Sequence, residues 1–395
     1  MTARKVLFNL RGLGFAEETV FGTDPTGQVA IRSFDSSFEP KPNMIDVPFT
    51  KTEPLRGPDA RIKGGLGGTL KFKSYLRAYP GYECPCLSLM KRMGATLYSC
   101  AAGSGKVTAG TSVTIRALEG DLASITAIGQ AVLHVPVSGT TSLRFVTRIQ
   151  LNTPTGNDTT ITVNAAFATT PGVGDSFAAV DTIMPTAGDP AKYFSFNFWQ
   201  GSNAGSDCIK WIVSGCSGKW ALDSVTAGGI PVISFEMECD NYSFSEAGTT
   251  TAADAVAPGR PILGDKFMVD GAATDIKSLS FDPQMEMVVL DAVSGSNGRS
   301  GFTFVGCSPK MEVDPLHDTG WQTKLEVPTM FDAQFESIFS ATSAWGIWIP
   351  GAYVDACPEE DSNGIMRRKL TIVGRDPGKN TDSAVYPLWA LAVTK

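Results

Sequence analysis

Apolar and polar residues alternate along much of the chain, and this period of two predicts a succession of short β-strands. Residues 29–38 (VAIRSFDSSF) and 68–79 (GTLKFKSYLRAY) show the alternation clearly, the second with Leu70 and Phe72 on one face and Lys71 on the other. Both runs end in turn-forming residues, as strands of a sheet usually do.

The middle of the chain, residues 107–190, is rich in Thr, Val and Ser, with Gly at the expected turns. Three further apolar runs follow it, at residues 192–201, 208–223 and 230–244. Many short strands separated by turn residues are typical of a β-sandwich or a β-barrel, so we predict a mainly β fold.

Residues 85–93 (PCLSLMKRM) predict a short helix. Pro85 suits the first turn of a helix, Leu87 and Met90 share one face, and Gly94 stands where a helix usually ends.

Residues 328–339 (PTMFDAQFESIF) predict a second helix. Phe331, Phe335, Ile338 and Phe339 follow the spacing i, i+4, i+7, i+8, which forms one apolar stripe on a helix.

Three segments lack a clear period. Residues 1–27 are predicted to form an N-terminal arm with a turn-rich end, GTDPTG. Residues 40–68 are rich in Pro and Gly, and a loop of this length in a compact domain usually has a function. Residues 249–259 (TTTAADAVAPG) are predicted to be a linker.

One short pattern occurs twice, as GCSGKWALD at residues 215–223 and as GCSPKMEVD at residues 306–314. Each half of the chain is thus expected to contain strands, one strand of this pattern and one short helix. A repeated order of elements indicates a repeated module. We therefore predict two related β modules, residues 1–255, which include a β-rich central segment at 103–190, and residues 256–395.

The 395 residues include 43% hydrophobic and 18% charged residues, with a net charge of −7. The composition is that of a globular protein, and the sequence contains no Lys/Arg-rich run, which argues against a groove that grips nucleic acid through its phosphates. A chain of negative net charge can still surround DNA, if its role is to let the DNA slide past without binding it. The apolar run near the N-terminus is too short for a signal peptide, and we expect no membrane span.

Motifs for catalysis and cofactor binding are incomplete. Cys84 and Cys86 lack the second ligand pair of a zinc site, and buried thiols in a reducing cytoplasm are the favoured interpretation. The triplet DTG at 318–320 has no partner triplet for an aspartic protease, so we predict a turn there. The loop 101–106 misses two positions of a phosphate-binding loop. We predict no enzyme, no catalytic residue, no cofactor and no metal.

The opening segment GFAEETVFGTDPTG (14–27) resembles the N-terminal arm of bacteriophage major tail tube proteins, a family of the long-tailed phages related to the tube proteins of type VI secretion systems. The order that follows is similar too: a strand, a long loop, a strand and a short helix ending in Met-Gly. Residues 278–316 and the strand WGIWIPGAY at 345–353 resemble the same family.

This resemblance implies a structural virion protein that polymerises into stacked rings and forms the channel through which the genome enters the host. It implies the virion tail as location, with assembly in the host bacterial cytoplasm. The implied partners are further copies of the chain, other tail proteins such as the tape measure, baseplate and tail terminator, and DNA that passes without specific binding.

Under this resemblance the fold becomes two related β-sandwich or barrel tube modules, each flanked by one short α-helix, plus a long inter-subunit loop and an N-terminal arm. Three chains would close a ring with pseudo-sixfold symmetry if each module supplies one sixth. Six chains would be needed if the second module is a decoration; we favour three. The predicted inter-subunit contacts are Phe15, Glu17, Glu18, Phe21, Ile45, Phe49, Leu55, Arg56 and Arg61.

Two other functions remain open at this stage. A carbohydrate-binding or adhesive tail or fibre component could use the seven Trp and eight Tyr to stack on sugars, although most of these Trp lie in predicted strands. A hydrolase could use paired Asp and Glu side chains, whose distance in space the sequence does not give.

Overall fold

The structure is a computed structural model, and it describes residues 11–23, 28–47, 60–78, 83–102, 107–118, 124–152, 158–188, 193–201, 208–245, 261, 265–292, 298–315, 319–362, 365–378 and 384–395. The predicted linker at 249–259 lies outside these residues.

The first part of the chain contains β1 (Arg11–Glu17), β2 (Val29–Ile31), β3 (Ser33–Pro40), β4 (Asn43–Val47), β5 (Ala60–Gly65), β6 (Gly68–Tyr75), α1 (Pro85–Met90), β7 (Ala95–Cys100), β8 (Val107–Thr111), β9 (Thr114–Leu118), β10 (Ala131–Val135), β11 (Ser142–Asn152), β12 (Asp158–Val163), β13 (Ser176–Ala178), β14 (Val180–Pro185), β15 (Phe194–Gly201), β16 (Cys208–Thr226) and β17 (Val232–Ser245).

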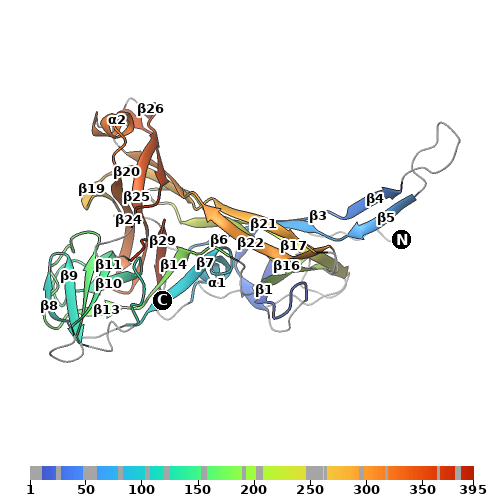
Figure 1. The fold of residues 1–395 in the computed structure, drawn as a ribbon, viewed down its shortest axis with the longest axis horizontal. Coiled ribbons are helices and arrows are strands. Elements are labelled where there is room, and N and C mark those ends of the chain that lie inside the picture. The colour runs from blue at the N-terminus through green and yellow to red at the C-terminus, as the bar shows by residue number, and fades with distance from the viewer. Residues whose placement is uncertain are drawn as a thin grey trace.

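The second part contains β18 (Lys266–Val269), β19 (Ala272–Thr274), β20 (Ile276–Asp282), β21 (Met285–Asp291), β22 (Arg299–Cys307), β23 (Lys310–Pro315), α2 (Thr319–Glu326), β24 (Phe331–Ser340), β25 (Ser343–Ala356), β26 (Glu359–Ser362), β27 (Ile365–Arg368), β28 (Leu370–Gly374) and β29 (Ala390–Thr394). The predicted mainly β fold is confirmed, and the described residues contain two short helices, α1 and α2 (Figure 1).

The two parts of the chain repeat one order of strand pairing. In the first, the strands pair as β2-β1-β15-β16-β17-β6-β3, and we call these strands with α1 the N-terminal module. In the second they pair as β19-β18-β24-β25-β28-β23-β20, and these strands with α2 form the C-terminal module. Each helix follows the strand before it in the same way, α1 after β6 and α2 after β23.

Both modules also carry the same β-bulge, an extra residue in one strand of a pair. In the N-terminal module the segment Val213–Cys216 of β16 lies opposite Phe194–Phe196 of β15. In the C-terminal module the segment 349–352 of β25 lies opposite 331–333 of β24, again with one residue more on the second strand. A bulge at the same place of the same pairing order indicates a duplicated fold.

The sequence repeat that suggested two modules does not mark equivalent strands. Residues 215–223 lie within β16, whereas residues 306–314 run from the end of β22 into β23. In the shared pairing order, β23 corresponds to β6 and β16 corresponds to β25. The two copies of the pattern instead flank β20, with β16 on one side and β23 on the other.

An insertion interrupts the N-terminal module between α1 and β15. Strands β7 and β14 pair with each other as its stem, and β8 to β13 form a six-stranded sheet of their own, which we call the inserted sheet. A separate hydrophobic cluster, including Leu133, Phe145 and Ile161, fills the inserted sheet. It packs against Trp348 and Ala390 of the C-terminal module.

The helix predicted at 328–339 is wrong, because these residues form most of β24. Both faces of β24 are covered: Phe331 and Phe335 belong to the main core, while Gln334 and Glu336 are buried beneath the inserted sheet. Burial on both faces removes the clean alternation that identifies a strand, and the phenylalanines then match a helical spacing by coincidence.

The second helix, α2, occupies residues where a turn was predicted after Asp314. Trp321 is buried in it and contacts Phe331 edge to face at 6.3 Å between ring centroids. Leu325, one turn later, packs on the same core. The pair at i and i+4 anchors this short helix to the C-terminal module.

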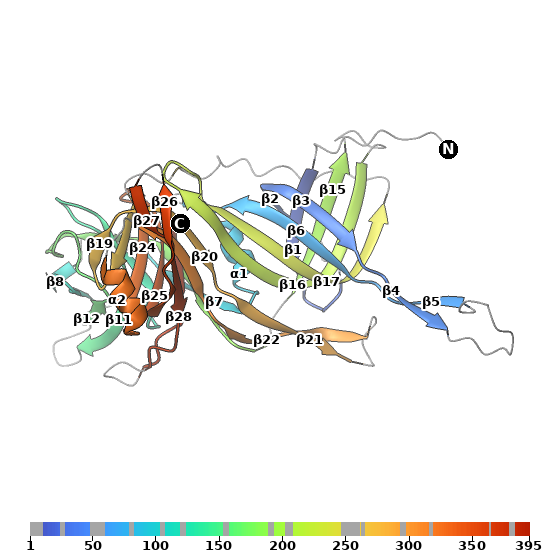
Figure 2. The same cartoon turned by 90° about the horizontal axis from the view of Figure 1, so that it is seen from above.

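The predicted loop at 40–68 contains regular structure, and the expectation of an aperiodic loop is wrong for its described part. Strands β4 and β5 pair antiparallel from Met44 opposite Lys63 to Val47 opposite Ala60. The hairpin β4–β5 and its counterpart β21–β22 both point toward the same end of the molecule (Figure 2). Each follows an equivalent strand, β3 or β20.

The predicted arm is also wrong for its described residues, 11–23. Residues 11–17 form β1, the strand that pairs with β2 and β15. Leu13 and Phe15 are buried in the main core, where Phe15 contacts Phe194 edge to face. These residues alternate with smaller ones, so they form a core strand and not a loose arm.

Candidate assembly surfaces

The two modules are joined edge to edge by pairing between β16 and β20. Leu222 lies opposite Phe281, and Val225 lies opposite Leu279. Because β20 also pairs with β23, one continuous sheet runs from the N-terminal into the C-terminal module.

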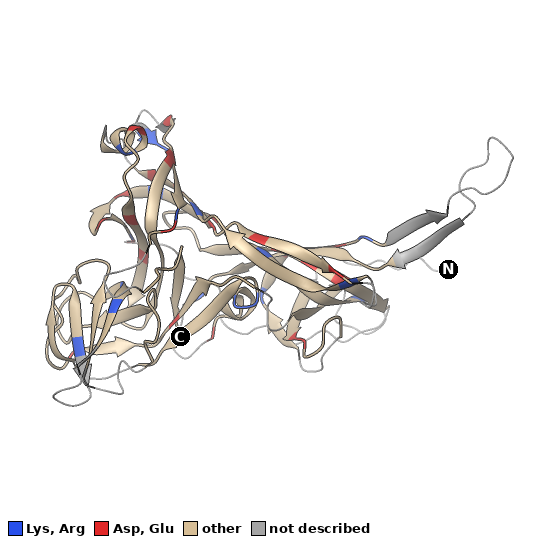
Figure 3. Cartoon of the chain, in the orientation of Figure 1, with Lys and Arg blue, Asp and Glu red and all other residues tan. Residues whose placement is uncertain are grey.

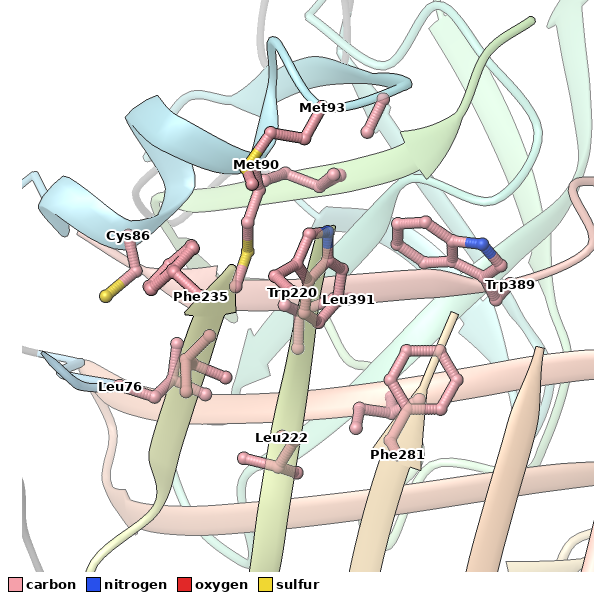
Figure 4. Close-up of a cluster of buried hydrophobic side chains, with 14 of the residues drawn as sticks. Leu76, Cys86, Met90, Met93, Trp220, Leu222, Phe235, Phe281, Trp389 and Leu391 are labelled. Carbon is pink, nitrogen blue, oxygen red and sulfur yellow. The ribbon is translucent and has the colours of Figure 1, made fainter. Parts of the chain in front are cut away.

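An aromatic cluster packs against one face of the sheet at this joint. Trp220, Phe281 and Trp389 contact one another with ring centroids 5.5 to 5.9 Å apart, and all three are buried (Figure 4). Leu222 and Leu391 complete the cluster. Aromatic packing of this kind stabilises beyond the area it buries, so the two modules behave as one core.

Several of the strands that the structure describes pair on one edge only, among them β2, β3, β7, β19 and β26. β3 pairs with β6 and with no other described strand, and β26 likewise pairs with β27 alone. An unpaired edge presents a row of main-chain donors and acceptors and is a template for pairing with another chain.

The face of the sheet opposite the aromatic cluster is polar and hollowed, with a cavity of about 770 Å³ over β3, β6, β16, β17 and β20. Two of its lysines form ion pairs across strands: Lys71 lies 2.7 Å from Glu236, and Lys73 lies 2.8 Å from Asp223. The hydrogen bond to Glu236 raises the pKa of Lys71, and the bond to Asp223 raises that of Lys73. We call this surface the concave face.

The C-terminal module continues this charge pairing. Lys310 on β23 lies 2.7 Å from Glu312, and this hydrogen bond lowers the pKa of Glu312. Figure 3 shows Lys and Arg interspersed with Asp and Glu over the molecule, not separated by sign.

The inserted sheet docks on β24 through a buried ion pair. Arg144 on β11 lies 2.6 Å from Glu336, with both side chains almost fully buried. Glu336 also accepts a hydrogen bond from the backbone N–H of Leu143, and Gln334 donates to the Leu143 carbonyl. These polar contacts satisfy groups that would otherwise be buried without partners.

Asp332, near the same interface, has a partly buried carboxyl group. Trp348 donates its indole N–H to one oxygen at 2.7 Å, and Asn164 donates to the other at 3.3 Å. Burial raises the pKa of Asp332 to about 7, despite these hydrogen bonds.

The buried histidine has a structural environment. His134 lies 2.8 Å from Asp175 within the inserted sheet, and its side chain has no exposed surface. Burial lowers the pKa of His134. Asp175 also accepts backbone N–H groups of Val137 and Gly172, so the carboxylate organises a turn. A pair closed to solvent cannot reach a substrate.

The cysteines fit the prediction of buried thiols. Cys84 and Cys86 are buried and free, beside α1. A hydrogen bond with Cys86 lowers the pKa of Cys84 to about 7, and the same bond raises that of Cys86. Across the described residues, no cluster of His, Cys, Asp and Glu could hold a metal ion.

Four of the predicted contact residues lie in the segment 11–23 and touch their own chain. Phe15 and Glu18 are 5% and 2% exposed, so they offer almost no surface to a neighbour. Glu18 accepts the backbone N–H groups of Gly22 and, at the bulge of β16, Gly215. Glu17 forms ion pairs with Lys91 and Arg92 of its own chain.

Phe21 packs edge to face on Tyr193 at 4.6 Å and on Phe302 at 6.3 Å. Because Phe302 lies on β22, Phe21 helps to hold the β21–β22 hairpin against the N-terminal module. Ile45 and Arg61 lie on the β4–β5 hairpin, opposite Ile62 and Asp46. Phe49, Leu55 and Arg56 lie outside the described residues.

The edges of β3 and β26 escaped the sequence reasoning, because nothing local separates an edge strand from a paired one. Six of the seven tryptophans are buried at 5% exposure or less, so these six offer no ring to a sugar: Trp199, Trp220, Trp321, Trp345, Trp348 and Trp389.

Comparison with known proteins gave no match from which a function could be inferred, so the proposed function rests on this geometry. No protein-family model matches the sequence, and no curated protein matches it. Among the described residues, none of the helices has the length and apolar character needed to cross a membrane.

Proposed function

We propose that this chain is a structural virion protein that polymerises into stacked rings and forms the tail tube of a bacteriophage, the channel for genome delivery. One observation carries the proposal: the chain holds two copies of one β module, already joined edge to edge in a single sheet. A unit that joins itself head to tail closes a ring when further copies repeat the joint.

Three chains, with two modules each, would then form a ring of six modules with pseudo-sixfold symmetry. The matching pairing orders favour three chains per ring. A second module that only decorated the outside of the ring would not need to repeat the whole sheet of the N-terminal module. Six chains per ring remain the alternative.

In this proposal the concave face lines the channel. Two of its Lys side chains, Lys71 and Lys73, are already paired with Glu236 and Asp223, so these two offer little free positive charge to DNA phosphates. With a net charge of −7, the chain would repel DNA weakly and let it slide.

The hairpins β4–β5 and β21–β22 are proposed to contact the next ring along the tube axis. Both project toward the same end of the molecule, and each forms a two-stranded sheet beyond the shared one (Figure 2). The β21–β22 hairpin is held by its own chain, since Phe302 and Phe304 are buried. An isolated two-stranded hairpin is marginally stable in water, so docking on a neighbour would stabilise β4–β5 in particular.

The remaining parts of the proposal follow from this role. The protein would act without catalysis, assemble in the cytoplasm of the bacterial host and reside in the virion tail. Its partners would be further copies of itself and the tape measure, baseplate and tail terminator proteins, with DNA passing through the lumen.

Negative-stain electron microscopy of the purified protein over a range of concentrations tests the proposal. We expect tubes of uniform width with a central channel when tail initiator components or high protein concentration are supplied. Compact single particles under all of these conditions would refute the tube.

A further inference from the structure

We propose that the exposed apolar end of α2 in one copy of the chain packs on an exposed aromatic patch of the N-terminal module in the next copy. The inference rests on the proposed self-assembly and specifies one of its contacts, in which the partner is a second copy of this chain. The helix end consists of Val327, Pro328 and Met330, and the aromatic patch consists of Trp211, Tyr242 and Phe244.

The aromatic patch lies near the start of β16 and the end of β17. Trp211 of β16 lies opposite Phe244 of β17, with their ring centroids 5.5 Å apart, and Tyr242 lies 5.9 Å from Trp211. Phe38 of β3 packs beside them, 5.6 Å from Tyr242. Phe244 is 62% exposed. Exposed aromatic side chains gathered in one place are typical of a protein–protein contact.

The β-bulge shared by the two modules identifies the corresponding residues of the C-terminal module. Val213 of β16 and Ile349 of β25 lie at the same place in this bulge. Counting two residues back along each strand, and then across to the strand paired with it, gives the positions that correspond. These pairs of positions are Trp211 and Ile347, Phe244 and Leu391, and Tyr242 and Trp389.

In the C-terminal module these positions are covered from within the chain. Ile347, Trp389 and Leu391 are 0%, 0% and 1% exposed. Met90 of α1 and Met93 just after it lie in one cluster with Trp389 and Leu391 (Figure 4). The end of α1 therefore covers the residues that correspond to the aromatic patch.

The two helices hold the same place in their modules, because α1 lies between β6 and β15 and α2 between the corresponding strands β23 and β24. Met93 is fully buried after α1, whereas Val327 and Met330 after α2 are 63% and 45% exposed. α2 lies at the opposite end of the molecule from the N-terminal module (Figure 2). Both sides of the internal contact thus recur uncovered, and a head-to-tail repeat would cover both.

The contact between copies lacks one part of the internal contact. The inserted stem follows α1, and its strand β14 pairs with β29. In the C-terminal module only residues 327–330 join α2 to β24. A contact made by apolar side chains without this strand pairing is smaller, so it forms only when copies are concentrated.

Charged substitutions in the full chain test this contact. Phe244→Asp alters the aromatic patch and Met330→Asp alters the helix end. The matched control is Val173→Asp, at an apolar residue that is 80% exposed in a loop of the inserted sheet. Near-UV circular dichroism checks the folding of each variant, and Phe244→Ser replaces Phe244→Asp if the latter unfolds. Analytical ultracentrifugation measures association over a range of concentrations, and electron microscopy of the same samples shows any tubes.

We expect Phe244→Asp and Met330→Asp each to raise the concentration needed for association about tenfold or more, because a charge replaces a central apolar contact. Val173→Asp should leave it unchanged. An equal mixture of the two variants should form dimers and stop there. In each dimer the intact helix end of the Phe244→Asp chain would dock on the intact patch of the Met330→Asp chain.

Tubes formed by both variants at the concentration that the unaltered protein needs would overturn this inference and leave the tube proposal standing. Association lost in only one variant would also overturn it, because the two surfaces would then not meet. Unaltered protein that stays monomeric, even with tail initiator components, would refute both proposals. Complexes that both variants lose, without tubes from the unaltered protein, would support the contact and contradict the tube.

Discussion

The buried ion pair between Arg144 and Glu336 is the contact whose removal should most weaken the docking of the inserted sheet. Glu336→Ala leaves the Arg144 guanidinium buried, with only the carbonyl oxygens of Leu143 and Ala166 as acceptors. It also removes the acceptor of the Leu143 N–H, 3.2 Å away. Breaking one side of a buried pair costs about 3–5 kcal/mol, because the remaining charge stays desolvated.

Replacing both partners should cost less than removing one. In Arg144→Leu/Glu336→Leu no buried charge remains, and apolar replacements of buried pairs are often close to neutral. Urea unfolding followed by tryptophan fluorescence measures both changes, since Trp348 lies at this interface, stacked on Phe145 at 5.5 Å. Glu236→Ala, which breaks an exposed pair, is the control and should change the midpoint little.

The reasoning is refuted if Glu336→Ala costs less than about 1 kcal/mol, the level of a surface pair. It is equally refuted if Arg144→Leu/Glu336→Leu loses as much stability as Arg144→Leu and Glu336→Leu lose separately when their losses are added together. Either result would mean that the charges are solvated or that the inserted sheet is held by other contacts.

Three other changes test the packing and the electrostatics. Phe281→Ala should destabilise by about 3–5 kcal/mol in calorimetry, because it opens the cluster beneath the joint of the modules; a loss under about 1 kcal/mol would contradict this. Asp332→Asn should remove a pH dependence of the free energy of unfolding, because the folded-state pKa of Asp332, about 7, lies above the unfolded value of 3.8. As pH rises from 4 to 8, the native protein should therefore lose stability relative to the variant. Stabilities that change in parallel with pH would contradict this. Gly218→Ala should destabilise the fold by about 1–3 kcal/mol, since the added Cβ would overlap the Glu236 carbonyl. Gly12→Ala is the control and should be tolerated, because the nearest atom to its Cβ would be 3.6 Å away. Equal melting temperatures of the two variants would argue against this packing.

The sequence allowed the fold class and α1 to be predicted, because period-two alternation and helix-end signals are local. The strand β6 was predictable for the same reason, with Phe72 in the core and Lys71 exposed. β24 was not, since contact with the inserted sheet buries Gln334 and Glu336 on its second face. No local pattern reports that kind of burial.

The candidate assembly surfaces depended on contacts between distant residues. Arg144 and Glu336 are 192 positions apart, and the pairing of β16 with β20 joins two modules. The repeated GCSxK pattern suggested duplication but aligned the wrong strands, because strand pairing and not residue identity is what the two modules share. Likewise, Phe15 looked like part of a free arm until its packing on Phe194 became visible.

A three-dimensional reconstruction of assembled particles by cryo-electron microscopy tests the central claim most directly. We predict a wall of six similar modules from three chains, in which β16–β20 pairing joins the two modules of each chain and the sheet continues from one chain to the next. A wall whose sheet is interrupted between chains, or one that takes a single module from each of six chains, would contradict the account.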